Sequence, residues 1–280
     1  IETWKDRLIA EQLMRKSEIV FKKKKKNNQH WEESFWWMLA KNFGAKVNSG
    51  PFENIAKSIP LKILAKHKSS LQQLEALLLG QAGLLQKSFT DHYPVMLQKE
   101  YNFLKTKYSL QPPGEPVHFL RMRPGNFPTI RLAQLAALIQ NSAHLFSKII
   151  EEPSVNKVKA LFTVNANNFW HYNYRLDDAS AYKPKSIGAA TIENIIINTV
   201  VPMLFAYGSF HQNQQLKDKA IKWITEIKAE KNNITKGFES IGFENQNAFD
   251  SQSLIECKTQ YCDLRRCLNC AIGNAILKRA

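Results

Sequence analysis

Four cysteines near the C-terminus are the residues whose type and spacing most clearly suggest chemistry. Cys257, Cys262, Cys267 and Cys270 are all the cysteines of the 280-residue chain, and they follow the pattern C-x4-C-x4-C-x2-C. Thiolates bind zinc and iron–sulfur clusters, and a C-x2-C element lets two sulfur atoms reach one centre across a tight turn. The clustering therefore predicts a metal centre with these four ligands. Zinc and a 4Fe–4S cluster both fit, and the spacing does not decide between them.

Disulfide bonds are the alternative use of clustered cysteines, and they require an oxidising compartment. Residues 1–20 carry charges throughout, so they lack the apolar core of a signal peptide, and nothing else in the sequence indicates secretion. We therefore expect a cytoplasmic protein. Four thiolate ligands leave no open coordination position, so the predicted centre is structural.

A second group of polar side chains surrounds a predicted helix start in the stretch HFLRMRPGNFPTIRLAQLA, residues 118–136. Pro-Gly favours a turn, and the next proline fits the first turn of a helix. A helix N-terminus and neighbouring arginines both attract anions, and an asparagine at the start can accept from free backbone amides. The predicted anion or nucleic-acid site consists of Arg121, Arg123, Asn126 and Arg131. The alternative is that the arginines pair with carboxylates and fix this loop to the core.

A third stretch, NNFWHYNYRLDD at residues 167–178, mixes aromatic and polar residues. Its aromatic rings could stack bases or sugars, and His171 is a candidate general base with Asp177 and Asp178 nearby in sequence. No spacing here fixes a catalytic geometry, so we favour an aromatic loop packed over helix ends, with His171 satisfied by a backbone partner. Phosphate-binding loops, dinucleotide fingerprints, nucleophile elbows and H-E-x-x-H motifs are all missing from the sequence. Whether the chain is an enzyme is left open.

The net charge of +15 favours a polyanionic partner, either nucleic acid or an anionic membrane surface. The alternative is a soluble protein that is rich in lysine and has no such partner, and the charge alone does not decide between them. The run Lys22–Lys26 predicts a solvated loop between helices and not a binding site. If the run binds a ligand, we expect phosphates without sequence preference.

The apolar stretch at residues 188–210 is long enough to span a membrane. Its polar residues and Pro202 instead favour a central buried helix, so we expect no membrane partner. Asn194 and Asn198 share one face of that helix. As buried amides they would need partners, and we expect them to hold a neighbouring loop.

Helical periodicity extends over nearly the whole chain and predicts an all-α fold, a multi-helix array. Residues 109–117, SLQPPGEPV, hold three prolines and a glycine and form the clearest linker. We therefore predict two packed helical subdomains, residues 1–110 and residues 111–280, the second with the cysteine cluster at 257–270. The sequence does not indicate an oligomeric state.

Several stretches together resemble one bacterial family of unknown function, found mainly in Bacteroidetes and catalogued as domain of unknown function 2851. The matching stretches are WEESFWWMLAKNFGAKVNSGPFENIA, LEALLLGQAGLL, RMRPGNFPTIRLAQLA, NIIINTVVPMLFAYG and YCDLRRCLNCAIGNAILK. They occur in order and cover most of the chain.

The resemblance implies that a region similar to a PD-(D/E)XK nuclease core precedes Ile1, so that this chain is the helical C-terminal part and lacks the catalytic carboxylates. It also implies a cysteine pattern of Y-C-x4-C-x2-C without Cys257. Such a three-cysteine site needs another ligand, such as a histidine, or binds no metal. We therefore expect a nucleic-acid-binding helical region of a nuclease-like protein. The alternative is a structural or protein-interaction module without catalytic activity.

Overall fold

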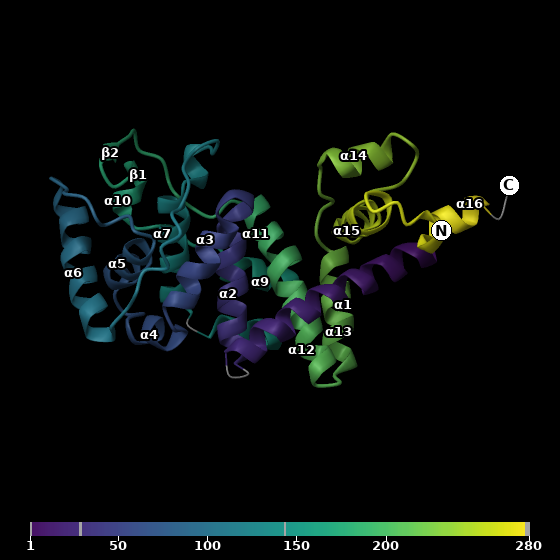
Figure 1. The fold of residues 1–280 in the computed structure, drawn as a ribbon, viewed down its shortest axis with the longest axis horizontal. Coiled ribbons are helices and arrows are strands. Elements are labelled where there is room, and N and C mark those ends of the chain that lie inside the picture. The colour runs from purple at the N-terminus through teal and green to yellow at the C-terminus, as the bar shows by residue number, and fades with distance from the viewer. Residues whose placement is uncertain (1, 28–29, 143, 278–280) are drawn as a thin grey trace. The chain divides into compact units, whose positions relative to one another are not determined.

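The computed structural model describes residues 2–27, 30–142 and 144–277 (Figure 1). Helices dominate the described residues, and the only named strands among them are β1 (Asn173–Arg175) and β2 (Asp178–Ala179), which form an antiparallel hairpin. The predicted all-α class is confirmed. The chain divides into two compact units. We call residues 27–199 the middle unit and residues 1–26 with 200–280 the terminal unit. The predicted boundary at 110/111 falls inside the middle unit.

The middle unit is a helical array with the short hairpin at one edge (Figure 1). Its helices are α2 (Trp31–Phe43), α3 (Ala45–Ser58), α4 (Leu61–Lys66), α5 (Leu71–Gln81), α6 (His92–Tyr108), α7 (Pro128–Asn141), α8 (Leu145–Glu151), α9 (Val155–Leu161), α10 (Asn168–His171) and α11 (Ala189–Ile195).

Helices α5 and α7 form the core of the middle unit. Every residue of α7 from Pro128 to Ile139 is buried, and Leu74 and Leu77 to Leu79 of α5 have no exposed surface. Local signals stabilise two of the helix starts. The Ser70 side chain accepts from the backbone N–H of Gln73 at the start of α5, and Pro128 occupies the first turn of α7, where its missing N–H costs no hydrogen bond.

Gly80 lets α5 approach α6 closely. A Cβ atom at this position would lie 2.1 Å from Cδ2 of Tyr101, so only glycine fits without rearrangement. Gly83 has another function, because its φ of +74° ends the helical segment in the left-handed region that glycine tolerates best.

The terminal unit consists of helices that are distant in sequence. They are α1 (Glu2–Lys26), α12 (Val201–Phe210), α13 (Gln214–Thr225), α14 (Asn233–Glu239), α15 (Ala248–Glu256) and α16 (Ala271–Leu277). Two ion pairs join α1 to α15: Lys5 with Asp250 at 2.7 Å, and Arg15 with Glu256 at 2.5 Å.

The prediction that the lysine run at 22–26 forms a loop is wrong, because these residues form the end of α1. Lys23 and Lys24 are buried, and the Lys24 ammonium lies 3.4 Å from the ring centroid of Phe210. Long aliphatic stems can pack against apolar surface while the cation contacts an aromatic face, which explains how a basic run ends a packed helix.

The apolar stretch is helical from α11 through the π-helical segment Ile196–Val200 to α12. Among the described residues, Ala189–Phe210 is the one helix long and apolar enough to cross a membrane by length and composition. Within its most apolar window 61% is buried, and core helices of soluble proteins pass the same test. The absence of a membrane partner stays a prediction.

Candidate anion-binding pocket

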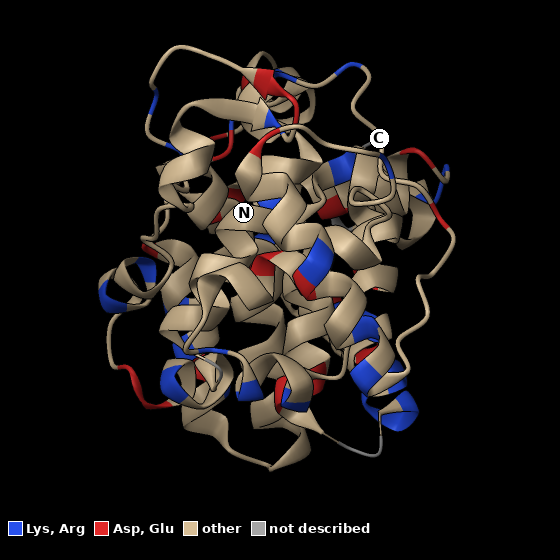
Figure 2. Cartoon of the chain, turned by 90° about the vertical axis from the view of Figure 1, so that its left-hand side faces the viewer, with Lys and Arg blue, Asp and Glu red and all other residues tan. Residues whose placement is uncertain are grey.

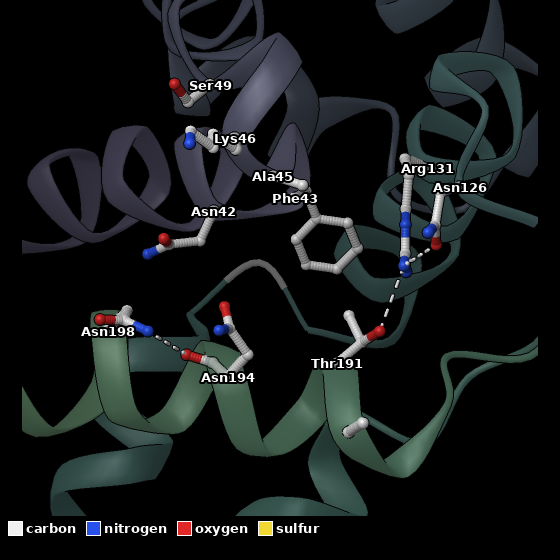
Figure 3. A pocket seen from close by; sticks show the side chains of 11 residues that line it. Asn42, Phe43, Ala45, Lys46, Ser49, Asn126, Arg131, Thr191, Asn194 and Asn198 are labelled. Atoms are coloured by element: carbon white, nitrogen blue, oxygen red, sulfur yellow. Dashed lines mark hydrogen bonds between the residues drawn. The ribbon is translucent and has the colours of Figure 1, made fainter. Parts of the chain in front are cut away.

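A polar pocket of about 540 Å³ opens in the middle unit between α2, the start of α3, the start of α7 and α11 (Figure 3). Its polar walls come from two stretches of sequence and from the loop before α7. The polar residues on the two helical walls are Asn42, Lys46, Ser49, Thr191, Asn194 and Asn198. Asn126 and Arg131 complete the lining from the α7 side (Figure 3).

Arg131 is the most buried charged group of this pocket, with 9% of its surface exposed. Its Nη2 donates to Oδ1 of Asn126 at 2.6 Å and to Oγ1 of Thr191 at 3.1 Å, and its Nη1 donates to Oε1 of Gln134 at 3.1 Å. All three acceptors are neutral. The guanidinium therefore keeps its full positive charge inside the protein without a carboxylate to balance it.

Two further features show that the described residues leave this charge without a counter-charge. A guanidinium carries five N–H donors, and the described partners use three of them. Burial lowers the pKa of Arg131, with no opposing contribution from an acidic neighbour. Buried charges in proteins are normally paired, since desolvation of an isolated ion is costly. An anion that enters the pocket would supply the missing partner.

The rest of the lining supports the same interpretation. Lys46 is the second cation of the pocket, and it is exposed. The described lining contains no Asp or Glu. The Asn194 side chain has no described hydrogen-bond partner, and Figure 3 shows it extending from α11 towards the α2 side of the pocket. Amide N–H groups and cations without competing carboxylates suit a phosphate or carboxylate group.

The structure brings together two of the four residues predicted for the anion site. Asn126 and Arg131 are hydrogen-bonded to each other in the pocket. Asn126 does not cap α7, because its side-chain oxygen accepts from Arg131 instead of the backbone amides. Arg121 and Arg123 are exposed and do not line the pocket, and no ion pair is described for either. The alternative in which the arginines pair with carboxylates is thus not seen in the described part of the chain.

Several pocket residues were missed by the sequence reasoning. Asn42, Lys46 and Ser49 are spaced i, i+4 and i+7, and Thr191, Asn194 and Asn198 are spaced i, i+3 and i+7. For the second set, a polar stripe at helical spacing on an apolar stretch was the available signal. The first set spans two helices, with Ala45 at a φ of 51° between them, so its spacing gives no such signal. Asn194 and Asn198 do share a face as predicted. The expectation that they are buried is wrong, because Asn194 is exposed and Asn198 is half-buried at the pocket wall.

The His171 loop has the structure favoured from sequence. Phe169 and Trp170 pack inward, and Nδ1 of His171 accepts from the backbone N–H of Lys185 at 3.3 Å. Asp177 pairs with Lys87 and not with His171. These contacts do not assemble a general base with an orienting carboxylate.

Residues 1–233 match the family described as "Protein of unknown function (DUF2851)". The chain belongs to this family. No curated protein and no solved structure matches it. All residues of the pocket lie within the matched part of this DUF2851 protein, whereas the four cysteines lie beyond it.

Three of the four thiols of the DUF2851 protein meet in the terminal unit. Cys257 and Cys262 begin and end the π-helical segment Cys257–Cys262, in which hydrogen bonds run from i to i+5. The C-x4-C spacing therefore corresponds to one π turn. Cys257 contacts both Cys262 and Cys270, and burial, together with these neighbouring thiols, raises its pKa.

Two of these thiols also pack among apolar side chains. Cys257 and Cys270 belong to a buried cluster with Trp4, Leu8 and Leu254. Cys267 is exposed and does not take part in the contact. Within residues 2–27, 30–142 and 144–277, no three His, Cys, Asp or Glu side chains are arranged to hold a metal ion. The four-ligand centre stays a prediction.

Proposed function

We propose that this protein is a nucleic-acid-binding helical region, in which the Arg131 pocket holds a phosphate group of the ligand. The buried, unbalanced guanidinium of Arg131 is the observation that carries the proposal. Phosphates are bound by arginine because its planar fork matches two oxygen atoms at once. The nuclease-like context is supported by the family resemblance alone.

The distribution of charge explains why a defined pocket matters. Figure 2 shows lysine and arginine spread over helices and loops of the face presented, with acidic residues among them. The net charge of +15 attracts polyanions in general, but it does not indicate where on the protein they bind. The pocket is a defined candidate site, because its described lining combines two cations with amide groups and contains no Asp or Glu.

A salt titration of binding tests the proposal. Fluorescence anisotropy with labelled DNA and RNA would give the dissociation constant at several salt concentrations. We expect binding that weakens as salt rises, and we expect K46Q and R131Q each to weaken it and to lower the salt slope by about 1. K66Q is the matched control, because Lys66 is an exposed lysine of α4 in the same unit and lies outside the pocket. No binding at low ionic strength contradicts the proposal.

A structural role for Arg131 is the second candidate, and one observation favours it. The Arg131 hydrogen bonds connect Asn126, Gln134 and Thr191, which come from three segments of the middle unit. If this is the whole role, R131Q lowers the melting temperature, K46Q has no effect, and neither changes binding to a polyanion. The exposed Lys46 makes the two candidates separable, since its loss does not disturb the fold.

A further inference from the structure

We infer that an aromatic and basic surface next to the pocket binds the unpaired bases of a single-stranded nucleic acid. This inference rests on the proposed nucleic-acid binding and names its substrate class. The surface is formed by the loop before α7 and by the hairpin with the segment after it. We call it the loop–hairpin surface, and its residues are Arg121, Arg123, Tyr172, Arg175, Tyr182 and Lys183.

Tyr172 and Tyr182 are the stacking elements. Their exposed fractions are 48% and 58%, which is high for large aromatic side chains. Their ring centroids are 5.2 Å apart and the rings are tilted by 55°, so the two rings are not stacked face to face. Exposed aromatic faces bind unpaired bases of any sequence, because every base has a π-face.

A ring contact and two backbone hydrogen bonds hold the two tyrosines in place. His171 packs edge-on against Tyr182, with ring centroids 5.9 Å apart. The Tyr172 carbonyl accepts from the backbone N–H of Ser180 at 2.7 Å, and the His171 carbonyl accepts from the N–H of Lys183 at 2.8 Å. The segment that carries Tyr182 is therefore tied to the start of the hairpin, and little ordering of the backbone is needed on binding.

Basic side chains accompany the rings. The Arg175 guanidinium lies 4.9 Å from the ring centroid of Phe119 and 5.2 Å from that of Phe127. These two contacts join the hairpin to the loop that carries Arg121 and Arg123. These three arginines and Lys183 are exposed, and none has a described ion pair. Of the two hairpin carboxylates, Asp177 is already paired with Lys87, and Asp178 is exposed. The local charge therefore favours phosphates.

The loop–hairpin surface and the pocket share structural elements. Asn126, at the end of the same loop, lines the pocket and contacts Arg131. Gln134 accepts from Arg131 and donates to the backbone carbonyl of Ser186 at 2.9 Å, just after the segment with Tyr182 and Lys183. A single strand that extends from the pocket along these shared elements would bring its bases to the tyrosines. A duplex cannot, since its bases are already stacked and paired.

The test compares single-stranded and duplex oligonucleotides of the same sequence. A length of about 12 nucleotides lies within the range that one such surface covers. Anisotropy is measured at low salt for the wild-type chain, for the double variant Y172A/Y182A, for Y172F/Y182F and for F103A. Phe103 is the matched control, because it is 60% exposed and lies on α6 outside the surface.

We expect single strands to bind more tightly than duplexes. Y172A/Y182A should weaken single-strand binding by about fivefold or more, corresponding to the loss of at least one base–aromatic stack. Y172F/Y182F and F103A should retain wild-type affinity. Wild-type binding of single strands by Y172A/Y182A would overturn the inference, and if R131Q is still weakened, the proposed function stands without it. If neither oligonucleotide binds at low salt, both proposals fail.

Discussion

Trp170 donates its indole N–H to Oε2 of Glu75 over 2.9 Å, and neither residue has exposed surface. Tyr93 donates to the same oxygen at 2.8 Å, while Oε1 of Glu75 has no partner. Neutral donors thus surround a buried carboxyl group with no described cation. Burial raises the pKa of Glu75 to about 7, and the two hydrogen bonds only partly oppose this rise.

This raised pKa predicts that stability falls as pH rises. The unfolded chain loses the Glu75 proton near its ordinary pKa of 4.5, whereas the folded chain keeps it until about pH 7. Between these values the folded state binds more protons, so each increase in pH favours unfolding. The total loss is on the order of 3 kcal/mol. Urea unfolding followed by tryptophan fluorescence at pH 5 and pH 8 measures it.

The substitution Glu75→Gln isolates this contribution. Glutamine does not titrate, so we expect E75Q to lose most of the pH dependence, whatever its absolute stability. E151Q is the control, since Glu151 is an exposed residue of α8. A difference between pH 5 and pH 8 that is unchanged in E75Q would show that another group is responsible.

Gly80 gives a prediction about packing. Gly80→Ala places a methyl group 2.1 Å from the Tyr101 ring, so α5 and α6 must separate or Tyr101 must move. We expect a loss of about 1–3 kcal/mol, as is typical of overpacking. Gly237→Ala in α14 is the control, because no atom lies within 4 Å of the added Cβ. It should be neutral or stabilising by about 1 kcal/mol. Equal melting temperatures for G80A and the wild type would refute the close contact.

The cysteine cluster leads to a prediction about metal content. The sequence predicts zinc or a 4Fe–4S cluster at the four cysteines. Binding would require the thiols to rearrange, because no three of them are arranged to hold a metal within the described residues. Elemental analysis and a visible spectrum of anaerobically purified protein should show about one zinc per chain or iron with sulfide, and C267S should lower that content. Protein without either metal would identify Cys257 and Cys270 as packing residues of their apolar cluster.

Local signals accounted for much of the fold. Ser70 as a cap and Pro128 in a first turn each depend on chemistry within a few residues, and the structure contains both. The lysine run at 22–26 was predicted wrongly for the converse reason. Its helical state depends on contacts such as that of Lys24 with Phe210, which is far away in sequence.

Contacts between residues far apart in sequence also limited the prediction of the pocket. The loop sequence identified Asn126 and Arg131, but Thr191 is 60 residues further along the chain, and nothing in its own neighbourhood points to an arginine partner. Arg121 and Arg123 have the same residue type and nearly the same position as Arg131, yet they are exposed. Burial separates the three, and burial depends on the packing of α7 against the rest of the unit.

The hydrogen bond between Asn126 and Arg131 supports a sharper test of the pocket than removal of the arginine. Asn126→Asp would place a carboxylate at the position of the 2.6 Å hydrogen bond and would balance the guanidinium from within the protein. The fold should keep or gain stability, by about 1 kcal/mol, because a charged acceptor strengthens the bond. Anion binding should be lost, because the new carboxylate competes for the same charge. Inorganic phosphate should therefore raise the melting temperature of the wild type and leave that of N126D unchanged. Asn102→Asp, on the exposed side of α6, adds the same charge elsewhere and should respond to phosphate like the wild type. An equal phosphate response from N126D and the wild type would exclude Arg131 as the anion ligand.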